Sequence, residues 1–251
     1  DTPHSSDIGS DIGTVINLKS SVSKDNPNIG IFSEISKDGY GSNLSNSGDI
    51  IGGDNNYGIY GVYIWHDTGK IKLGNNSVGI FGLANVVDSP SEVNVTDGEI
   101  EVGNNSKGIF VSGNSAANVI NGAKMTIGDN SFAYVLDTKE IPADPITGTP
   151  VVQSVLESNS TDETKLGNNS IFIYSSDKTA LITNNTPLRT TGNKNYGIYA
   201  SGEITNLADM DFSAGVGNVG ILNVRDIGST TSKAVNGQLG AASQPTITVG
   251  K

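Results

Sequence analysis

The chain has 251 residues, of which 35% are hydrophobic and 16% charged, with a formal net charge of −11 at pH 7 and no cysteine. An acidic chain lacks the basic patches that nucleic acids and anionic membranes require as partners, and without cysteine it forms neither a disulfide nor a thiolate zinc site. No run of about eighteen apolar residues is long enough for a membrane helix. The 32 glycines and many short Asn clusters instead favour short strands joined by tight turns.

One phrase recurs along the chain. Two apolar residues stand two positions apart, a Gly-Asn-Asn-Ser turn comes next, and the phrase ends in Gly-Ile and an aromatic residue. Copies or fragments of it occur at 28–32, 53–60, 71–81, 100–110, 127–131, 166–170, 192–199 and 218–222. The glycine before Ile recurs after 28, 21 and 29 residues from Gly30 to Gly108. This period fits one coil of a β-helix, whereas a propeller blade needs about 40 residues.

Each copy makes physical sense as part of a coil. Ile100 and Val102 lie two apart and would point inward from one strand, with Glu101 between them in water. Coils stacked about 4.8 Å apart would place like residues over like. We therefore predict an all-β fold, a right-handed parallel β-helix (β-solenoid) with one larger insertion.

The Gly-Asn-Asn-Ser turns are predicted to form the corners of these coils. Glycine and asparagine tolerate the positive φ that a tight corner requires, and stacked amides can hydrogen-bond along the axis. The residues expected in this structural corner ladder are Asn75, Asn76, Asn104, Asn105, Asn168 and Asn169.

The repeat is interrupted over residues 137–164, which contain three prolines and are predicted to form a loop insertion between two coils. The last residues, 247–251, begin a new copy of the phrase. Because neither end has the polar cap that a solenoid needs, residues 1–251 are expected to form a single segment of a longer β-helix.

One segment, 57–67, contains the single Trp and three of the eight Tyr. If Val62 and Ile64 point inward, Tyr63 and Trp65 share the outer face, where exposed aromatic residues beside polar groups bind proteins or sugars. In the opposite register, Trp65 fills the core. Both registers are compatible with the sequence. The candidate binding residues are Tyr63, Trp65, His66 and Asp67.

Catalytic chemistry has weaker support. Glu99/Glu101 and Asp209/Asp211 each share a strand face, but carboxylates beside inward apolar residues are more simply solvent-facing. His4 lies in a terminus that is expected to fray, and His66 has no Ser or Asp motif around it beyond the neighbouring Asp67. Gly52-Gly53-Asp54-Asn55 matches a calcium-binding repeat only once. The sequence therefore predicts no enzyme activity, no catalytic or metal-ligating residues, and no cofactor.

The phrase Gly-Asn-Asn-Ser-x-Gly-Ile-Phe/Tyr, at 74–81 and 103–110, resembles the passenger-domain repeats of the large fusobacterial type V autotransporter adhesins, the group that contains RadD. The resemblance extends from about Ile16 to Lys251. It implies an extracellular passenger on a bacterial surface, anchored in the outer membrane by a C-terminal barrel that is not in this sequence. It also implies adhesion to other bacteria or host cells, with a protein or glycan receptor as partner. A β-helical polysaccharide lyase or hydrolase and a purely structural spacer remain the alternatives.

Overall fold

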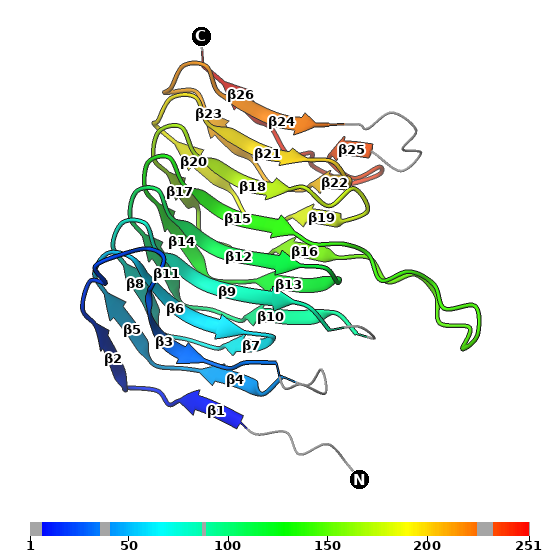
Figure 1. Cartoon of the computed structure of the whole chain (residues 1–251). Coiled ribbons are helices and arrows are strands. Elements are labelled where there is room, and N and C mark those ends of the chain that lie inside the picture. The colour runs from blue at the N-terminus through cyan, green and yellow to red at the C-terminus, as the bar shows by residue number, and fades with distance from the viewer. Residues whose placement is uncertain (1–6, 36–40, 87–88, 225–232, 251) are drawn as a thin grey trace.

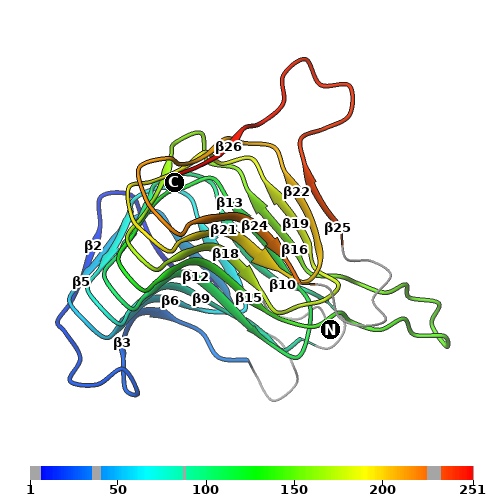
Figure 2. The same cartoon turned by 90° about the horizontal axis from the view of Figure 1, so that it is seen from above.

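The computed structural model describes residues 7–35, 41–86, 89–224 and 233–250. The regular secondary structure of these residues consists of β-strands, which pair in parallel to form three sheets. Figures 1 and 2 show these strands wound into stacked coils with a three-sided outline. Seen from the C-terminal end, the chain runs counterclockwise as it rises, which makes the winding right-handed (Figures 1 and 2). The predicted right-handed parallel β-helix is confirmed.

Each coil contributes one strand to each sheet in the order A, B, C, except the last, whose described strands lie in sheets A and B. Sheet A contains β1 (Asp7–Ser10), β4 (Asn43–Asn46), β7 (Tyr63–His66), β10 (Ser91–Val95), β13 (Ala117–Asn121), β16 (Val155–Ser158), β19 (Leu181–Asn184), β22 (Glu203–Asn206) and β25 (Lys233–Asn236). Sheet B contains β2 (Val15–Leu18), β5 (Asp49–Gly52), β8 (Lys70–Leu73), β11 (Glu99–Val102), β14 (Lys124–Ile127), β17 (Thr164–Leu166), β20 (Leu188–Thr190), β23 (Met210–Phe212) and β26 (Ile247–Val249). Sheet C contains β3 (Asn28–Phe32), β6 (Asn56–Gly61), β9 (Val78–Ala84), β12 (Lys107–Gly113), β15 (Phe132–Asp137), β18 (Ile171–Ser175), β21 (Tyr196–Ala200) and β24 (Val219–Asn223).

The core consists of columns of like residues. Ile100 pairs with Ile71 on the coil before it and with Met125 on the coil after it, and all three are fully buried. Glu101, between the two inward residues of β11, is on the outer face. Burying a large aliphatic side chain contributes about 1.5–3 kcal/mol, so each added coil extends one continuous core. The inward and outward positions predicted for this strand are confirmed.

The corner between sheets B and C repeats the same backbone conformation from coil to coil. The third corner residue has a positive φ between 53° and 58° in six coils, at Asn55, Asn76, Asn105, Asn130, Asn169 and Lys194. Five of these six residues are Asn, the residue that tolerates the left-handed region best after Gly. The conformation predicted for Asn76, Asn105 and Asn169 is confirmed.

The second corner residue links each coil to the next. The Asn75 Oδ1 accepts a hydrogen bond from the Asn104 backbone N–H at 2.8 Å, and the Asn104 Oδ1 accepts one from the Asp129 N–H at 2.8 Å. Equivalent bonds join every step from Asp54 to Val216. The predicted ladder therefore exists, but its bonds run mainly from backbone N–H to side-chain oxygen rather than between amides.

An arm leaves the solenoid between β15 and β16 and projects to one side (Figure 1). Antiparallel bridges Ile141↔Val152 and Asp144↔Thr149 hold its two strands together. The arm spans residues 138–154 and is shorter than the predicted 137–164, because 155–158 form β16, which pairs in register with β13.

Candidate functional site

The two aromatic residues of β7 lie on the outer face of sheet A. Val62 and Ile64 are fully buried, whereas Tyr63 and Trp65 are partly exposed. Of the two registers that the sequence allows, the structure therefore adopts the one that places both rings outside.

Small and polar residues surround these rings. In the register of sheet A, Trp65 lies between Ser45 on β4 and Asn94 on β10, and Tyr63 is next to Glu92. We call Tyr63, Trp65, Ser45, Glu92 and Asn94 the Trp65 patch. Among the described residues, neither aromatic ring of the patch contacts another aromatic ring.

The Tyr63 ring is held from the next coil. Its hydroxyl lies 3.2 Å from the Ser89 Oγ. A single residue, Val62, separates β6 from β7, so this coil contributes no loop of its own beside Tyr63. The patch thus rests on a strand and is braced by one hydroxyl contact.

His66 is not part of this surface. Its side chain points inward and is fully buried, with Nδ1 at 2.9 Å from the Asn46 Nδ2 and 3.1 Å from the Asn46 carbonyl oxygen. Burial lowers the pKa of the His66 imidazole below its ordinary 6.5. The candidate group is therefore divided: Tyr63 and Trp65 face outward, Asp67 is exposed at the corner after β7, and His66 belongs to the interior.

His66 is one member of a column of inward residues at the ends of the sheet A strands. The column contains Asn46, His66, Val95, Asn121, Ser158, Asn184, Asn206 and Asn236. Amide–amide hydrogen bonds link its upper part, with Asn184 Nδ2 donating to Asn206 Oδ1 at 2.7 Å and Asn206 Nδ2 to Asn236 Oδ1 at 2.6 Å. Hydrogen bonds thus join neighbouring members in parts of this column, and His66, bonded to Asn46, has a structural position within it.

A second set of outward aromatic residues lines sheet C and was not identified as a surface from the sequence. Its members are Phe32, Tyr57, Tyr60, Phe81, Phe110, Phe132, Tyr174, Tyr196 and Tyr199. The rings pack on one another: Tyr60 stacks on Phe81 with centroids 4.8 Å apart, and Phe81 meets Phe110 edge to face at 4.7 Å. The available signal was the aromatic residue directly after the inward Ile in most copies of the phrase, as in Ile80-Phe81 and Ile198-Tyr199.

The paired carboxylates considered for catalysis are bound to cations or to backbone. Glu101 lies 2.8 Å from Lys72 Nζ and 3.0 Å from Lys70 Nζ, and Glu99 lies 3.0 Å from Lys70 Nζ. Hydrogen bonds from Lys72 and Lys70 lower the pKa of the Glu101 carboxyl. A general acid needs the opposite shift, because it must hold its proton near neutral pH.

The second carboxylate pair caps turns. Asp211 Oδ1 accepts the Ser213 N–H at 2.9 Å, and hydrogen bonding from Ser213 lowers the pKa of the Asp211 carboxyl. Asp209 Oδ1 accepts the Thr246 N–H at 2.6 Å. The isolated Asp54 match to a calcium-binding repeat lies in the corner ladder, where its Oδ1 accepts the Asn75 N–H.

Metal-binding clusters and membrane-spanning helices are both absent from the described part of the chain. No group of three or more His, Asp or Glu side chains there could hold a metal ion. The same residues contain no helix of the length and hydrophobicity needed to cross a membrane.

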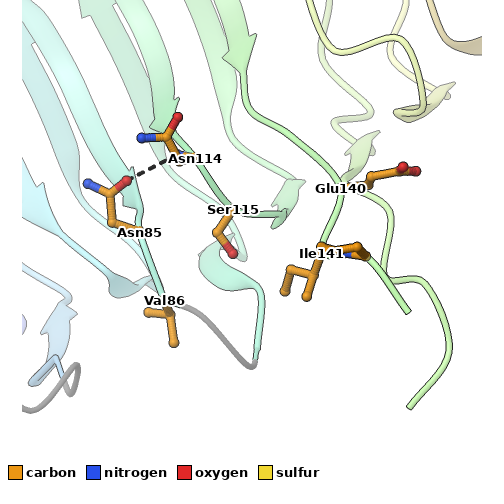
Figure 3. Close-up of a pocket in the computed structure, with 7 residues that line it drawn as sticks. Asn85, Val86, Asn114, Ser115, Glu140 and Ile141 are labelled. Atoms are coloured by element: carbon orange, nitrogen blue, oxygen red, sulfur yellow. Dashed lines mark hydrogen bonds between the residues drawn. The ribbon is translucent and has the colours of Figure 1, made fainter. Parts of the chain in front are cut away.

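Two hollows flank the root of the arm. The first, of about 430 Å³, is lined by Val86, Ile141 and Pro142 together with polar residues (Figure 3). The Asn85 Oδ1 there already accepts the Asn114 N–H at 3.0 Å, as the dashed line in Figure 3 shows. The second, of about 520 Å³, lies between residues 137–142 and 176–179. Neither hollow is lined by a histidine that could act as a base beside its carboxylates, so we do not assign chemistry to them.

Comparisons of the chain with protein-family models, with curated proteins and with solved structures found no match.

Proposed function

We propose that this chain is a non-catalytic segment of a surface-displayed bacterial adhesin, and that it attaches the cell to another bacterium or to a host cell. The observation that carries the proposal is the Trp65 patch. Two aromatic side chains stand on the outer face of a sheet whose other outward positions nearby are small or polar. Outward aromatic residues contribute nothing to the core of the coil, and such residues are typical of recognition surfaces.

The scaffold suits this role. Continuous core columns and the corner ladder join each coil to the next, so the patch is presented on a stiff support. A rigid support reduces the entropy lost on binding, because the recognising side chains are already in place. The resemblance of the repeat to autotransporter passengers supports the extracellular, outer-membrane-anchored location that we propose with this function.

The test is attachment by the purified chain. Beads coated with the chain are mixed with bacterial and epithelial cells, and the free chain is added as a competitor. We expect the beads to adhere, and we expect Tyr63→Ala/Trp65→Ala to reduce adhesion at least tenfold, the loss typical of interface hot spots. Ile120→Ala is the matched control, because Ile120 lies on the outer face in the same column as Trp65, two coils away, and is 38% exposed.

Undiminished adhesion by the double variant would remove the Trp65 patch from the proposal. Failure of the wild-type chain to adhere or to compete would favour the structural spacer. The corner ladder supports that second candidate, since it stiffens the solenoid whether or not the solenoid binds anything.

A further inference from the structure

The two aromatic surfaces of this molecule differ in what lies beside each ring. On sheet C each ring contacts another ring, stacked as in Tyr60–Phe81 or edge to face as in Phe81–Phe110. On sheet A the residue next to Trp65 on the preceding coil is Ser45, and the one beyond it is Gly9. The indole of Trp65 therefore has small neighbours on the preceding coils, whereas each sheet C ring has another aromatic ring beside it.

We propose that the Trp65 patch is a binding site for a neutral glycan. This inference rests on the proposed function and specifies the class of receptor. Sugar rings present C–H groups that pack on the face of an aromatic ring, and Tyr63 and Trp65 present two such rings from backbone positions about 6.6 Å apart along one strand. The site therefore has room for two adjacent sugar units.

The polar members of the patch match the hydroxyl groups of a sugar. The Asn94 amide both donates and accepts, the Ser45 hydroxyl does the same, and the Glu92 carboxylate accepts. Within the described part of the chain, these three side chains make no hydrogen bond to other protein groups, so their donors and acceptors remain available to a ligand. A few polar groups around an aromatic wall are the usual composition of a small-ligand site.

Charge decides against acidic sugars. The ionised groups of the patch and its corner are the carboxylates of Glu92 and Asp67. The nearby Lys70 and Lys72 lie on sheet B, where they pair with Glu99 and Glu101. A uronate, sialate or sulfate would meet repulsion here, and the net charge of −11 adds to it.

A folded protein is the weaker match for this patch. Stable protein interfaces bury about 800 Å² per partner around an apolar centre. Two rings surrounded by Ser, Asn and Glu offer no such centre, whereas they are sufficient for one or two sugar rings. The glycan is therefore the occupant that the composition favours.

Trp65 provides a direct readout, because it is the single Trp in the chain. The purified chain is titrated with soluble galactan, mannan and β-glucan as neutral probes, and with alginate and heparin as acidic probes, while the tryptophan emission is followed. We expect a saturable change with at least one neutral probe and none with the acidic ones. A glycan array then compares wild type with Trp65→Ala, Trp65→Phe and Ile120→Ala. We expect Trp65→Ala to weaken neutral-glycan binding more than tenfold, Trp65→Phe to weaken it less, and Ile120→Ala to leave it unchanged.

Cell treatments separate this inference from the proposed function. If protease abolishes bead adhesion while periodate oxidation of cell-surface sugars leaves it intact, the receptor is a protein; the glycan site is then wrong and the adhesin proposal stands. Unchanged emission with every neutral probe, or stronger binding of acidic ones, would also overturn the glycan site. Absence of adhesion to any cell would reject the proposed function itself.

Discussion

The corner ladder makes a quantitative prediction at Ser106, the fourth residue of its corner. The Ser106 side chain is 1% exposed; its Oγ accepts the Ser77 N–H from the previous coil at 3.0 Å and donates to the Asn104 carbonyl oxygen at 3.0 Å. Ser106→Ala removes one oxygen atom and leaves the buried Ser77 N–H without an acceptor. An unsatisfied buried donor costs about 1–3 kcal/mol, so we expect a loss of stability in that range.

The measurement should report on the corner itself, because stacked coils need not unfold in a single transition. Hydrogen exchange at the Ser77 amide is therefore followed together with urea denaturation, and exchange should accelerate between about fivefold and about 140-fold. Ser112→Ala on the same coil is the control, since its hydroxyl lies on the outside, 3.5 Å from Asp137 Oδ2, and its removal should change stability by less than about 0.5 kcal/mol. Equal effects of the two variants, or unchanged exchange at Ser77, would refute the claim that the hydrogen bond from Ser77 to Ser106 stabilises the corner.

Three further predictions concern backbone conformation, buried charge and surface charge. Asn105 has a φ of 54°, so Asn105→Val should lower the urea midpoint by an amount equivalent to about 1–2 kcal/mol, while Asn105→Gly should leave it nearly unchanged. Equal midpoints for the two variants would show that the positive φ does not determine which residues are tolerated at this corner. Because burial lowers the pKa of His66, the unfolded chain binds that proton more readily, so the stability contributed by neutral His66 should be lost as pH falls from about 6.5 toward the folded pKa. His66→Asn should remove this component when denaturation is compared at pH 8 and pH 5, and an unchanged pH profile would contradict it. Lys70→Met breaks partly exposed ion pairs with Glu99 and Glu101 and should lower the free energy of unfolding by less than about 1 kcal/mol. The difference from wild type should shrink in 0.5 M salt, and a loss of stability that does not depend on salt would count against a Coulombic origin.

The sequence was sufficient to predict sheet B and its corner because both obey strict local rules there. Apolar residues two apart, as in Ile100 and Val102, identify the inward face, and Asn in the third corner position identifies the positive φ. Sheet C breaks the alternation. In β9 the consecutive residues Gly79 and Ile80 are both buried, so a strict two-residue period counted from Gly79 assigns Ile80 to the wrong face. A Cβ on Gly79 would stand 2.6 Å from the Gly108 carbonyl oxygen, and this close approach between coils is a three-dimensional fact that a single sequence does not display.

The inward position of His66 was missed for a different reason. The same alternation that places Ile64 inward also places His66 inward, but a histidine beside Trp65 was assigned to the surface because of its chemistry. The sheet A strands end in an inward column that is polar in most coils, which hydrophobicity cannot reveal. The column also explains why 155–158 were assigned to the insertion: Ser158 is a buried member of β16, and a polar residue at that position resembles a loop in the sequence.

The stacking that fixes the inward and corner residues places no comparable demand on the outward residues around Trp65 on sheet A. An inward Ile64 must match Leu44 and Val93 on the neighbouring coils, whereas the outward Trp65 has Ser45 on one side and Asn94 on the other, which are unlike it and unlike each other. A residue that does not pack against matching neighbours can be replaced without disturbing the coil. A solenoid of this kind can therefore gain a binding residue at an outward position at little cost in stability, and Trp65, an outward Trp between two polar residues, is an example of such a position. If Trp65 were instead required by the fold, Trp65→Ala would destabilise the chain by the several kcal/mol typical of a buried aromatic residue; we expect less than about 1 kcal/mol.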